Sequence, residues 1–128
     1  MSVVLDASAI LALIYREPGH DRVTAALPGA VASTVNWAEV VTTLVRRGHP
    51  DATTAAEAIR ALGIEVTPFT PHQAVRAGLL WTSTHPAGLS LGDRACLAVA
   101  ESSTVEAVLT SDRAWAELDT TASVELIR

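Results

Sequence analysis

Short apolar runs alternate with longer helical stretches along the whole chain, and this alternation constrains the fold more than any other feature. The runs lie at 2–5, 30–33, 64–67, 107–110 and 124–127. Short apolar runs of this kind are typical of strands that are buried on both faces of a parallel sheet. Because a helical stretch separates most of them, the sequence predicts an α/β fold in which helices flank a parallel sheet.

The helical stretches are bounded by residues that start and stop helices. Asp51 is a typical N-cap, Gly63 a typical stop, and Pro71 stands where a helix can begin. We predict helices over 7–16, 20–27, 34–47, 51–62, 71–84, 91–102 and 113–118. With 128 residues, 49% of them hydrophobic, the chain is long enough for one domain over residues 1–128.

The charged residues exclude several classes of enzyme. All nine basic residues are Arg, and Lys is absent. A P-loop needs a Lys on the phosphates and Schiff-base chemistry needs a Lys amine, so both are excluded. Aspartyl-phosphate folds also generally use a Lys. The net charge of −5 argues against a broad basic face for nucleic acid.

Cysteine content and hydropathy point to a compartment. The single Cys96 excludes an internal disulfide and a cysteine metal cluster. The longest apolar run, 9–15, is far too short to span a membrane, and no basic stretch precedes an apolar one at the N-terminus. We therefore expect a cytoplasmic protein without membrane contact.

Acidic residues stand where an α/β sheet places its ligands. Asp6 directly follows the first apolar run, and Asp112 follows the fourth after one residue. Asp93 lies in the first turn of the helix at 91–102, and Glu39 lies about one turn into the helix at 34–47. Ligands of such sheets bind beyond the carboxyl ends of the strands, so these acids are candidates for a site.

Two interpretations of these acids remain open on spacing alone. Asp6 and Asp112 could be N-caps, Asp93 could form a capping box with Ser90, and Glu39 could belong to a solvated stripe. Together, however, four converging carboxylates would raise one another's pKa, and a hard divalent cation such as Mg²⁺ would favour such a cluster. Without these four, the chain has 10 acids against 9 bases, so most of the net charge belongs to the cluster.

The four acids lie in four segments, which are VVLDASA at 3–9, NWAEV at 36–40, LGDRACLA at 91–98 and LTSDRAW at 109–115. In this order, the segments resemble PIN-domain ribonucleases, and most closely the VapC-type toxins of toxin–antitoxin modules. The resemblance covers essentially the whole chain. It departs from the family at Ala114 and Trp115, where an acid and Phe are common, and this difference concerns packing more than chemistry.

The resemblance implies a fold and a site. The fold is a three-layer α/β/α sandwich with a five-stranded parallel sheet. The activity is that of an endoribonuclease that depends on Mg²⁺ or Mn²⁺. The family's acidic quartet, which binds metal and carries catalysis, corresponds to Asp6, Glu39, Asp93 and Asp112. Residues that support the quartet correspond to Ser8, Asn36, Arg94 and Ser111.

The resemblance also implies a mechanism and partners. A metal-polarised water attacks the phosphodiester in line and leaves a 5′-phosphate and a 3′-hydroxyl. The usual substrate is structured RNA, often a tRNA cut in a single-stranded loop. The family usually forms homodimers and is inhibited by a cognate antitoxin protein.

Three basic residues lie close together in the sequence and form its only tight basic cluster. They are Arg46, Arg47 and His49, at the end of the helix at 34–47. Arg46 and Arg47 could contact RNA phosphates. Alternatively, they are cations that the dipole of a helix C-terminus favours.

Two alternative functions, different from that of a ribonuclease, also remain open. One is a non-catalytic PIN-like module that binds RNA or protein and uses its acids as helix caps. The other is a small-molecule phosphatase with the same metal site, although the sequence contains no Gly-rich phosphate loop.

Overall fold

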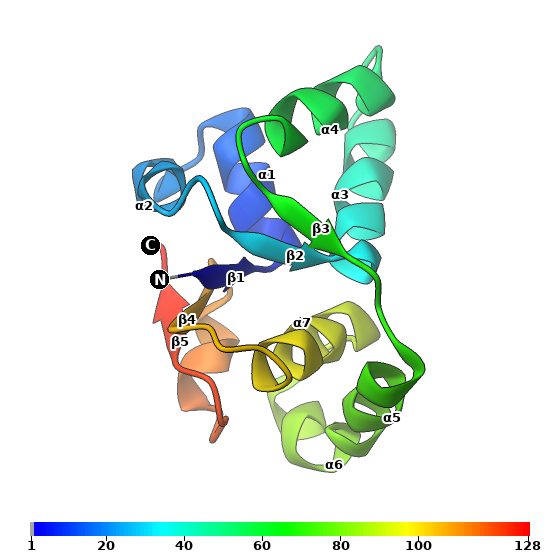
Figure 1. The fold of residues 1–128 in the computed structure, drawn as a ribbon, viewed down its shortest axis with the longest axis vertical. Helices are drawn as coiled ribbons and strands as arrows, with labels where there is room; N and C mark the ends of the chain where they lie inside the picture. Colours follow the sequence, from blue (N-terminus) through cyan, green and yellow to red (C-terminus); the bar gives the residue numbers. More distant parts are fainter. Residues whose placement is uncertain (1) are drawn as a thin grey trace.

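The computed structural model describes residues 2–128, and in it a parallel five-stranded sheet separates two groups of helices (Figure 1). The strand order is β3-β2-β1-β4-β5. The strands are β1 (Val3–Leu5), β2 (Val31–Ser33), β3 (Glu65–Thr67), β4 (Ala107–Thr110) and β5 (Val124–Leu126). The predicted α/β/α sandwich and its five parallel strands are therefore confirmed; Met1, the first residue of the predicted domain, lies outside the described residues.

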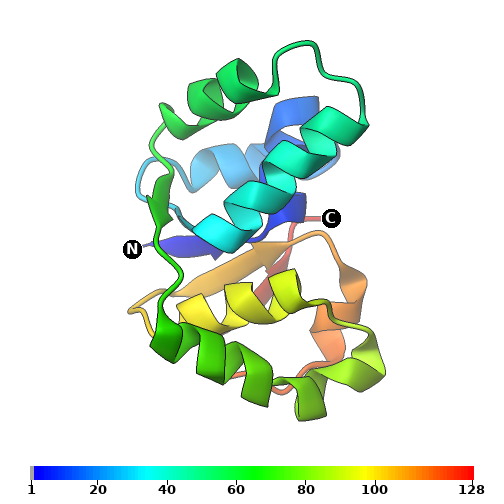
Figure 2. The same cartoon turned by 90° about the vertical axis from the view of Figure 1, so that its right-hand side faces the viewer.

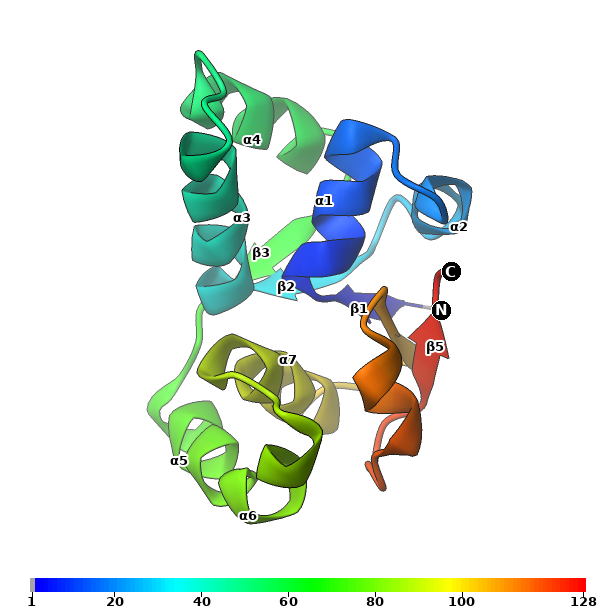
Figure 3. The same ribbon diagram turned by 180° about the vertical axis from the view of Figure 1, so that it is seen from behind.

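One face of the sheet is covered by the helices of the N-terminal half, seen from behind in Figure 3. These are α1 (Ala7–Tyr15), α2 (His20–Ala25), α3 (Thr34–Arg46) and α4 (Ala52–Arg60). Val3 and Leu5 of β1 point toward this layer and pack in one cluster with Ile10 of α1 and Leu44 of α3. Small and branched aliphatic side chains allow these helices to pack closely on the sheet.

The opposite face is covered by the C-terminal helices, as the turned view in Figure 2 shows. They are α5 (Pro71–Leu79), α6 (Trp81–Thr84) and α7 (Leu91–Glu101), with the 3₁₀ helices η1 (His85–Ala87) and η2 (Arg113–Glu117). Val4 of β1 and Val108 of β4 pack here against Leu97 and the fully buried Trp115. The alternation of Val3, Val4 and Leu5 between the faces is the normal alternation of side chains along a strand.

The structure differs from the predicted helices mainly at two places. The predicted helix over 71–84 is divided at Leu80, which is buried and whose carbonyl oxygen accepts hydrogen bonds from Thr84 N at 3.1 Å and Thr84 Oγ1 at 2.8 Å. The stretch at 113–118 forms a 3₁₀ helix instead of an α-helix. Within residues 2–128, none of the helices combines the length and the apolar character that crossing a bilayer requires.

The topology places β1 and β4 side by side at the centre of the sheet. From β1 the chain builds β2 and β3 on one side, and β4 and β5 lie on the other, so the order changes direction between β1 and β4. Asp6 N donates to Leu109 O at 3.2 Å, which joins the ends of the two strands. A crevice at such a switch point is where doubly wound sheets bind ligands.

Candidate active site

Asp6 is the most enclosed acidic residue of this region. It follows β1 and is only 4% exposed. Its Oδ1 accepts hydrogen bonds from Ser8 Oγ at 2.6 Å and from Ala9 N at 2.9 Å, and its Oδ2 accepts one from Thr110 Oγ1 at 2.5 Å. The bond from Ala9 N caps α1, as the sequence allowed.

Burial dominates the acidity of Asp6. It raises the pKa of this carboxyl from 3.8 to about 6, and the charge of Asp93 adds to the rise. The hydrogen bonds from Ser8, Thr110 and Ala9 act in the opposite direction, because they stabilise the anion. The fold thus keeps a carboxylate in a place where its charge is poorly solvated.

Glu39 reaches the site from α3 and is held by Asn36. The amide nitrogen of Asn36 donates to Glu39 Oε1 at 2.9 Å and to Gly92 O at 2.9 Å. Ser33 Oγ in turn donates to Asn36 Oδ1 at 2.7 Å, which fixes the orientation of the amide. A Cβ at Gly92 would overlap the carboxylate of Glu39, so a side chain at this position of α7 would displace Glu39 from its present orientation. Burial raises the pKa of Glu39.

Asp93 lies at the start of α7 and forms the capping box that its spacing from Ser90 predicts. Ser90 N donates to Asp93 Oδ2 at 2.9 Å, and Asp93 N donates to Ser90 Oγ at 3.2 Å. Burial raises the pKa of Asp93, and the charge of Asp112 raises it further. The charge of Asp93 also raises the pKa of Asp6 and of Glu39, so Asp93 is coupled electrostatically to each of the other three acids.

Asp112 follows β4 and caps η2. Its Oδ1 accepts a hydrogen bond from Ala114 N at 3.0 Å, and its backbone N–H donates to Thr110 Oγ1 at 3.0 Å. Its side chain is exposed, unlike that of Asp6. The quartet therefore ranges from an enclosed carboxylate to one that solvent and large molecules can reach.

The capping contacts leave carboxylate oxygens available. Among residues 2–128, no side chain or backbone group donates a hydrogen bond to Glu39 Oε2, Asp93 Oδ1 or Asp112 Oδ2. Within the same residues, none of the four acids forms an ion pair with Arg. A capping acid can therefore also bind a cation.

The donor set suits a hard divalent cation, although it does not form a closed cage. Within the described chain, no three His, Cys, Asp or Glu side chains are arranged to hold an ion together. Mg²⁺ commonly keeps several waters and binds to one or two carboxylates together with substrate phosphates. Oxygen ligands, crowded negative charge and raised pKa values fit an ion held in this way.

The four predicted supporting residues are placed differently. Ser8 and Asn36 donate directly to members of the quartet. Ser111 contributes its backbone N–H, which donates to Ser8 Oγ at 2.9 Å. Arg94 points to α5 instead, where its Nη1 donates to Ala77 O at 2.9 Å. Adjacent residues of a helix point about 100° apart, so Asp93 and Arg94 face different neighbours.

Sequence reasoning missed Thr110, whose hydroxyl connects two acids. It is fully buried, donates to Asp6 and accepts from the backbone N–H of Asp112. The available signal was a hydroxyl residue at the last position of a strand next to β1. Gly92 was also missed, and its signal was a glycine in the first turn of an otherwise regular helix.

The predicted basic cluster is not one surface. The Arg47 guanidinium lies 4.6 Å from the centre of the Tyr15 ring, and His49 Nδ1 accepts a hydrogen bond from Asp51 N at 3.0 Å. Arg46 instead lines a groove along α3 that also includes Glu39. Cys96 is buried among apolar residues, as expected for a small hydrophobic side chain, and burial raises the pKa of its thiol.

Comparison with known proteins identifies the family. The sequence model of the PIN-domain family matches residues 3–120, so this chain belongs to the PIN-domain family. None of the curated proteins matches the sequence.

Solved structures of VapC and VapBC toxin–antitoxin proteins are similar to this chain. VapC20 from Mycobacterium tuberculosis, a sarcin–ricin-loop cleaving toxin, is 25% identical with a TM-score of 0.74 over 91% of this chain and 96% of that one. VapBC-5 from the same organism is 25% identical with a TM-score of 0.63, over 99% of this chain and 98% of that one. DNA-bound VapBC from Salmonella typhimurium shares the fold at 17% identity, with a TM-score of 0.77 over 100% and 99% of the two chains.

Proposed function

We propose that this chain is the toxin of a toxin–antitoxin pair and acts as an endoribonuclease that depends on Mg²⁺ or Mn²⁺. One observation carries the proposal: the charge of Asp93 is coupled to the charges of Asp6, Glu39 and Asp112, and none of these four carboxylates has an Arg partner among the described residues. Repulsion of this kind is relieved when a divalent cation binds.

The four acids take different roles in the proposed reaction. Asp6, Asp93 and Asp112 hold the cation directly or through water, and Asp6 is oriented for this by Ser8 and Thr110. When bound, the ion supplies positive charge beside the phosphate and lowers the pKa of water. Glu39, whose pKa burial raises, orients the attacking water and accepts its proton.

The proposed substrate is structured RNA, and a tRNA in particular. A protein reads RNA sequence in single-stranded loops, where unstacked bases are accessible. Asp112 is exposed at the rim of the quartet, so a looped strand can approach from that side without unfolding the site. The similar VapC20 is a sarcin–ricin-loop cleaving toxin, which supports structured RNA as the class of substrate.

The proposed partner is a cognate antitoxin protein, and the proposed assembly is a homodimer acting in the cytoplasm. Two of the similar structures are VapBC proteins, which supports an antitoxin. An inhibitor that places a cation among the four carboxylates would be favoured for the same electrostatic reason as a metal ion.

A cleavage assay on total tRNA tests the proposal. The wild type and Asp6→Asn are compared with Mg²⁺, with Mn²⁺ and with EDTA, after removal of any antitoxin. We expect discrete cuts that need both the metal and Asp6, with 5′-phosphate ends. Cleavage that persists in EDTA or in Asp6→Asn would contradict the metal mechanism.

The alternative, a non-catalytic PIN-like binding module, is favoured by a different observation. Asp6, Asp93 and Asp112 all cap helices. In that case the folded wild type would bind RNA or protein without cutting RNA, and Asp6→Asn would change thermal stability but not binding.

A further inference from the structure

An open groove of about 630 Å³ runs along α3 and extends past Glu39, one member of the quartet, to the basic end of the helix. It follows one face of α3 from Thr34 to Arg46, with Glu39 near the middle of its lining and Arg46 at the C-terminal end. Glu39 and Arg46 lie seven positions apart, which corresponds to about 10 Å along the helix axis. The remaining lining residues are uncharged: Thr34, Val35, Ala38, Thr42 and Thr43.

The two adjacent arginines at this end of α3 have different environments. Arg47 packs over the ring of Tyr15 and does not line the groove. Arg46 is exposed, and among residues 2–128 no carboxylate lies within ion-pairing distance of it. Arg46 therefore offers the groove a guanidinium whose hydrogen-bond donors remain available.

We infer that this groove binds the backbone of the RNA strand on one side of the cleavage position, with Arg46 on a phosphate. The inference rests on the proposed function and specifies where the RNA substrate lies on the protein surface. A phosphate suits this position because guanidinium donors match phosphate oxygens and the hydroxyls of Thr42 and Thr43 can donate to the same strand. For a chain with a net charge of −5, such a local cation is needed to hold a polyanion.

The first test measures RNA binding without cleavage. A short, fluorescein-labelled single-stranded RNA is titrated with protein in EDTA at several salt concentrations, and anisotropy gives Kd. Arg46→Ala should weaken binding about fivefold at low salt and reduce the slope of log K against log salt by about 0.7, the value for one phosphate of a single strand. Arg47→Ala is the matched control and should leave both quantities unchanged.

A variant that should bind RNA more tightly distinguishes a direct effect on binding from a loss of folding. Thr42 is exposed in the middle of the groove, and Thr42→Arg should tighten binding and steepen the salt dependence by about the same amount. Equal binding by Arg46→Ala and Arg47→Ala, or no binding by the folded wild type, would overturn the inference, and a protein segment would then be the better occupant of the groove.

Cleavage by the wild type with Mn²⁺, measured on the same preparation, tests the nuclease activity separately from RNA binding in the groove. If the wild type cleaves RNA and the two alanine variants bind RNA equally, RNA binding in the groove is refuted and the nuclease activity is supported. The expected difference between the variants without any cleavage supports the groove and refutes the nuclease.

Discussion

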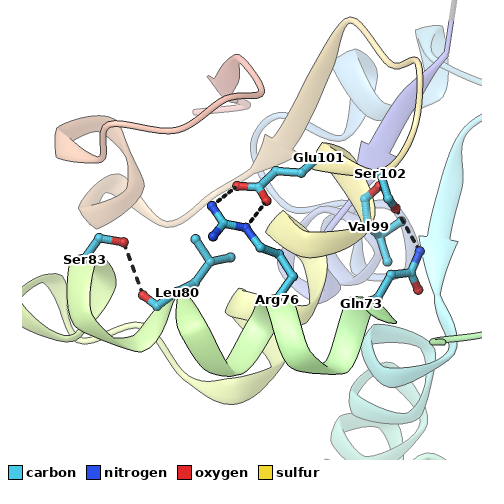
Figure 4. Close-up of polar contacts among 7 residues, drawn as sticks. All are labelled: Gln73, Arg76, Leu80, Ser83, Val99, Glu101 and Ser102. Carbon is cyan, nitrogen blue, oxygen red and sulfur yellow. Dashed lines mark hydrogen bonds and ion pairs between the residues drawn. The ribbon is translucent and has the colours of Figure 1, made fainter. Parts of the chain in front are cut away.

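The two ends of α7 hold carboxylates in opposite ways. At the C-terminal end, Glu101 accepts hydrogen bonds from Arg76 of α5 at 2.5 Å and 3.2 Å, and Gln73 donates to Ser102 beside it at 2.9 Å (Figure 4). At the N-terminal end, the charge of Asp93 repels the charges of Asp6, Glu39 and Asp112. One helix therefore carries a neutralised acid at one end and three repelling neighbours at the other.

The difference shows at which end of α7 the chain itself supplies a counter-charge for the acid. The pair of Glu101 and Arg76 closes α5 onto α7, and Arg94 contributes a further contact through Ala77 O. Arg94 directly follows Asp93 in the sequence, yet its guanidinium is used between helices and not to neutralise the quartet. At the N-terminal end, none of the four acids has an Arg partner among the described residues.

The largest effect is expected when one carboxylate is removed from each group of acids in turn. Asp6→Asn should reduce RNA cleavage about 10³-fold or more, because the interaction with the cation and the phosphate is worth several kcal/mol. Glu101→Gln, the matched variant at the other end, should keep the rate of the wild type and lose only its pair with Arg76. Initial rates on a loop-containing RNA measure both, and equal losses would refute the distinction.

The second prediction concerns pH and the metal-free protein. The pKa of Asp6 is raised from 3.8 to about 6, so its contribution to stability is fully present below pH 3.8 and is lost as pH rises through about 6. The loss amounts to about 3 kcal/mol by neutral pH. Urea denaturation in EDTA from acidic to neutral pH should show this loss in the wild type.

Two variants make the pH experiment specific. Asp6→Asn should flatten the dependence by the same amount, because the neutral amide does not titrate. Glu101→Gln leaves Asp6 intact, so this variant should still lose stability as pH rises through about 6. A wild-type and an Asp6→Asn profile that run parallel would show that Asp6 is not the titrating group.

The third prediction is that a divalent ion stabilises only one end of α7. At about one hundred times its Kd, Mn²⁺ should raise the free energy of unfolding by about 2.7 kcal/mol. Thermal denaturation should show this gain for the wild type and for Glu101→Gln, but not for Asp93→Asn. An equal gain in all three proteins would place the ion elsewhere.

Much of the fold follows from the sequence because the signals are local. Four-residue apolar runs predicted every strand of the sheet to within a residue at each end, and Ser90 with Asp93 predicted the start of α7. The division of the helix over 71–84 did not follow, because it depends on the burial of Leu80 beneath neighbouring segments. Burial against residues distant in sequence has no local pattern.

The site shows the same limit. Asp6 and Asp112 were located by their positions at strand ends, and Glu39 and Asp93 by the order of motifs. The contacts that orient them could not be located in this way, because they join different segments. Thr110 and Asp6 lie 104 residues apart, and Asn36 meets Gly92 O across 56 residues. For this reason Ser111 was expected to support the quartet, while the neighbouring Thr110 was overlooked.

Thr110 gives the smallest effect and tests the orientation of Asp6. Thr110→Val keeps the shape of the side chain but removes the donor to Asp6 Oδ2 and the acceptor of the Asp112 N–H. Loss of such a supporting contact should lower the cleavage rate about tenfold. The pKa of Asp6 should rise further, because one of the hydrogen bonds that stabilise its anion is lost. Thr110→Ser, which keeps the hydroxyl, should restore both the rate and the pH profile. A role in packing alone predicts the reverse, because valine preserves the volume that serine loses.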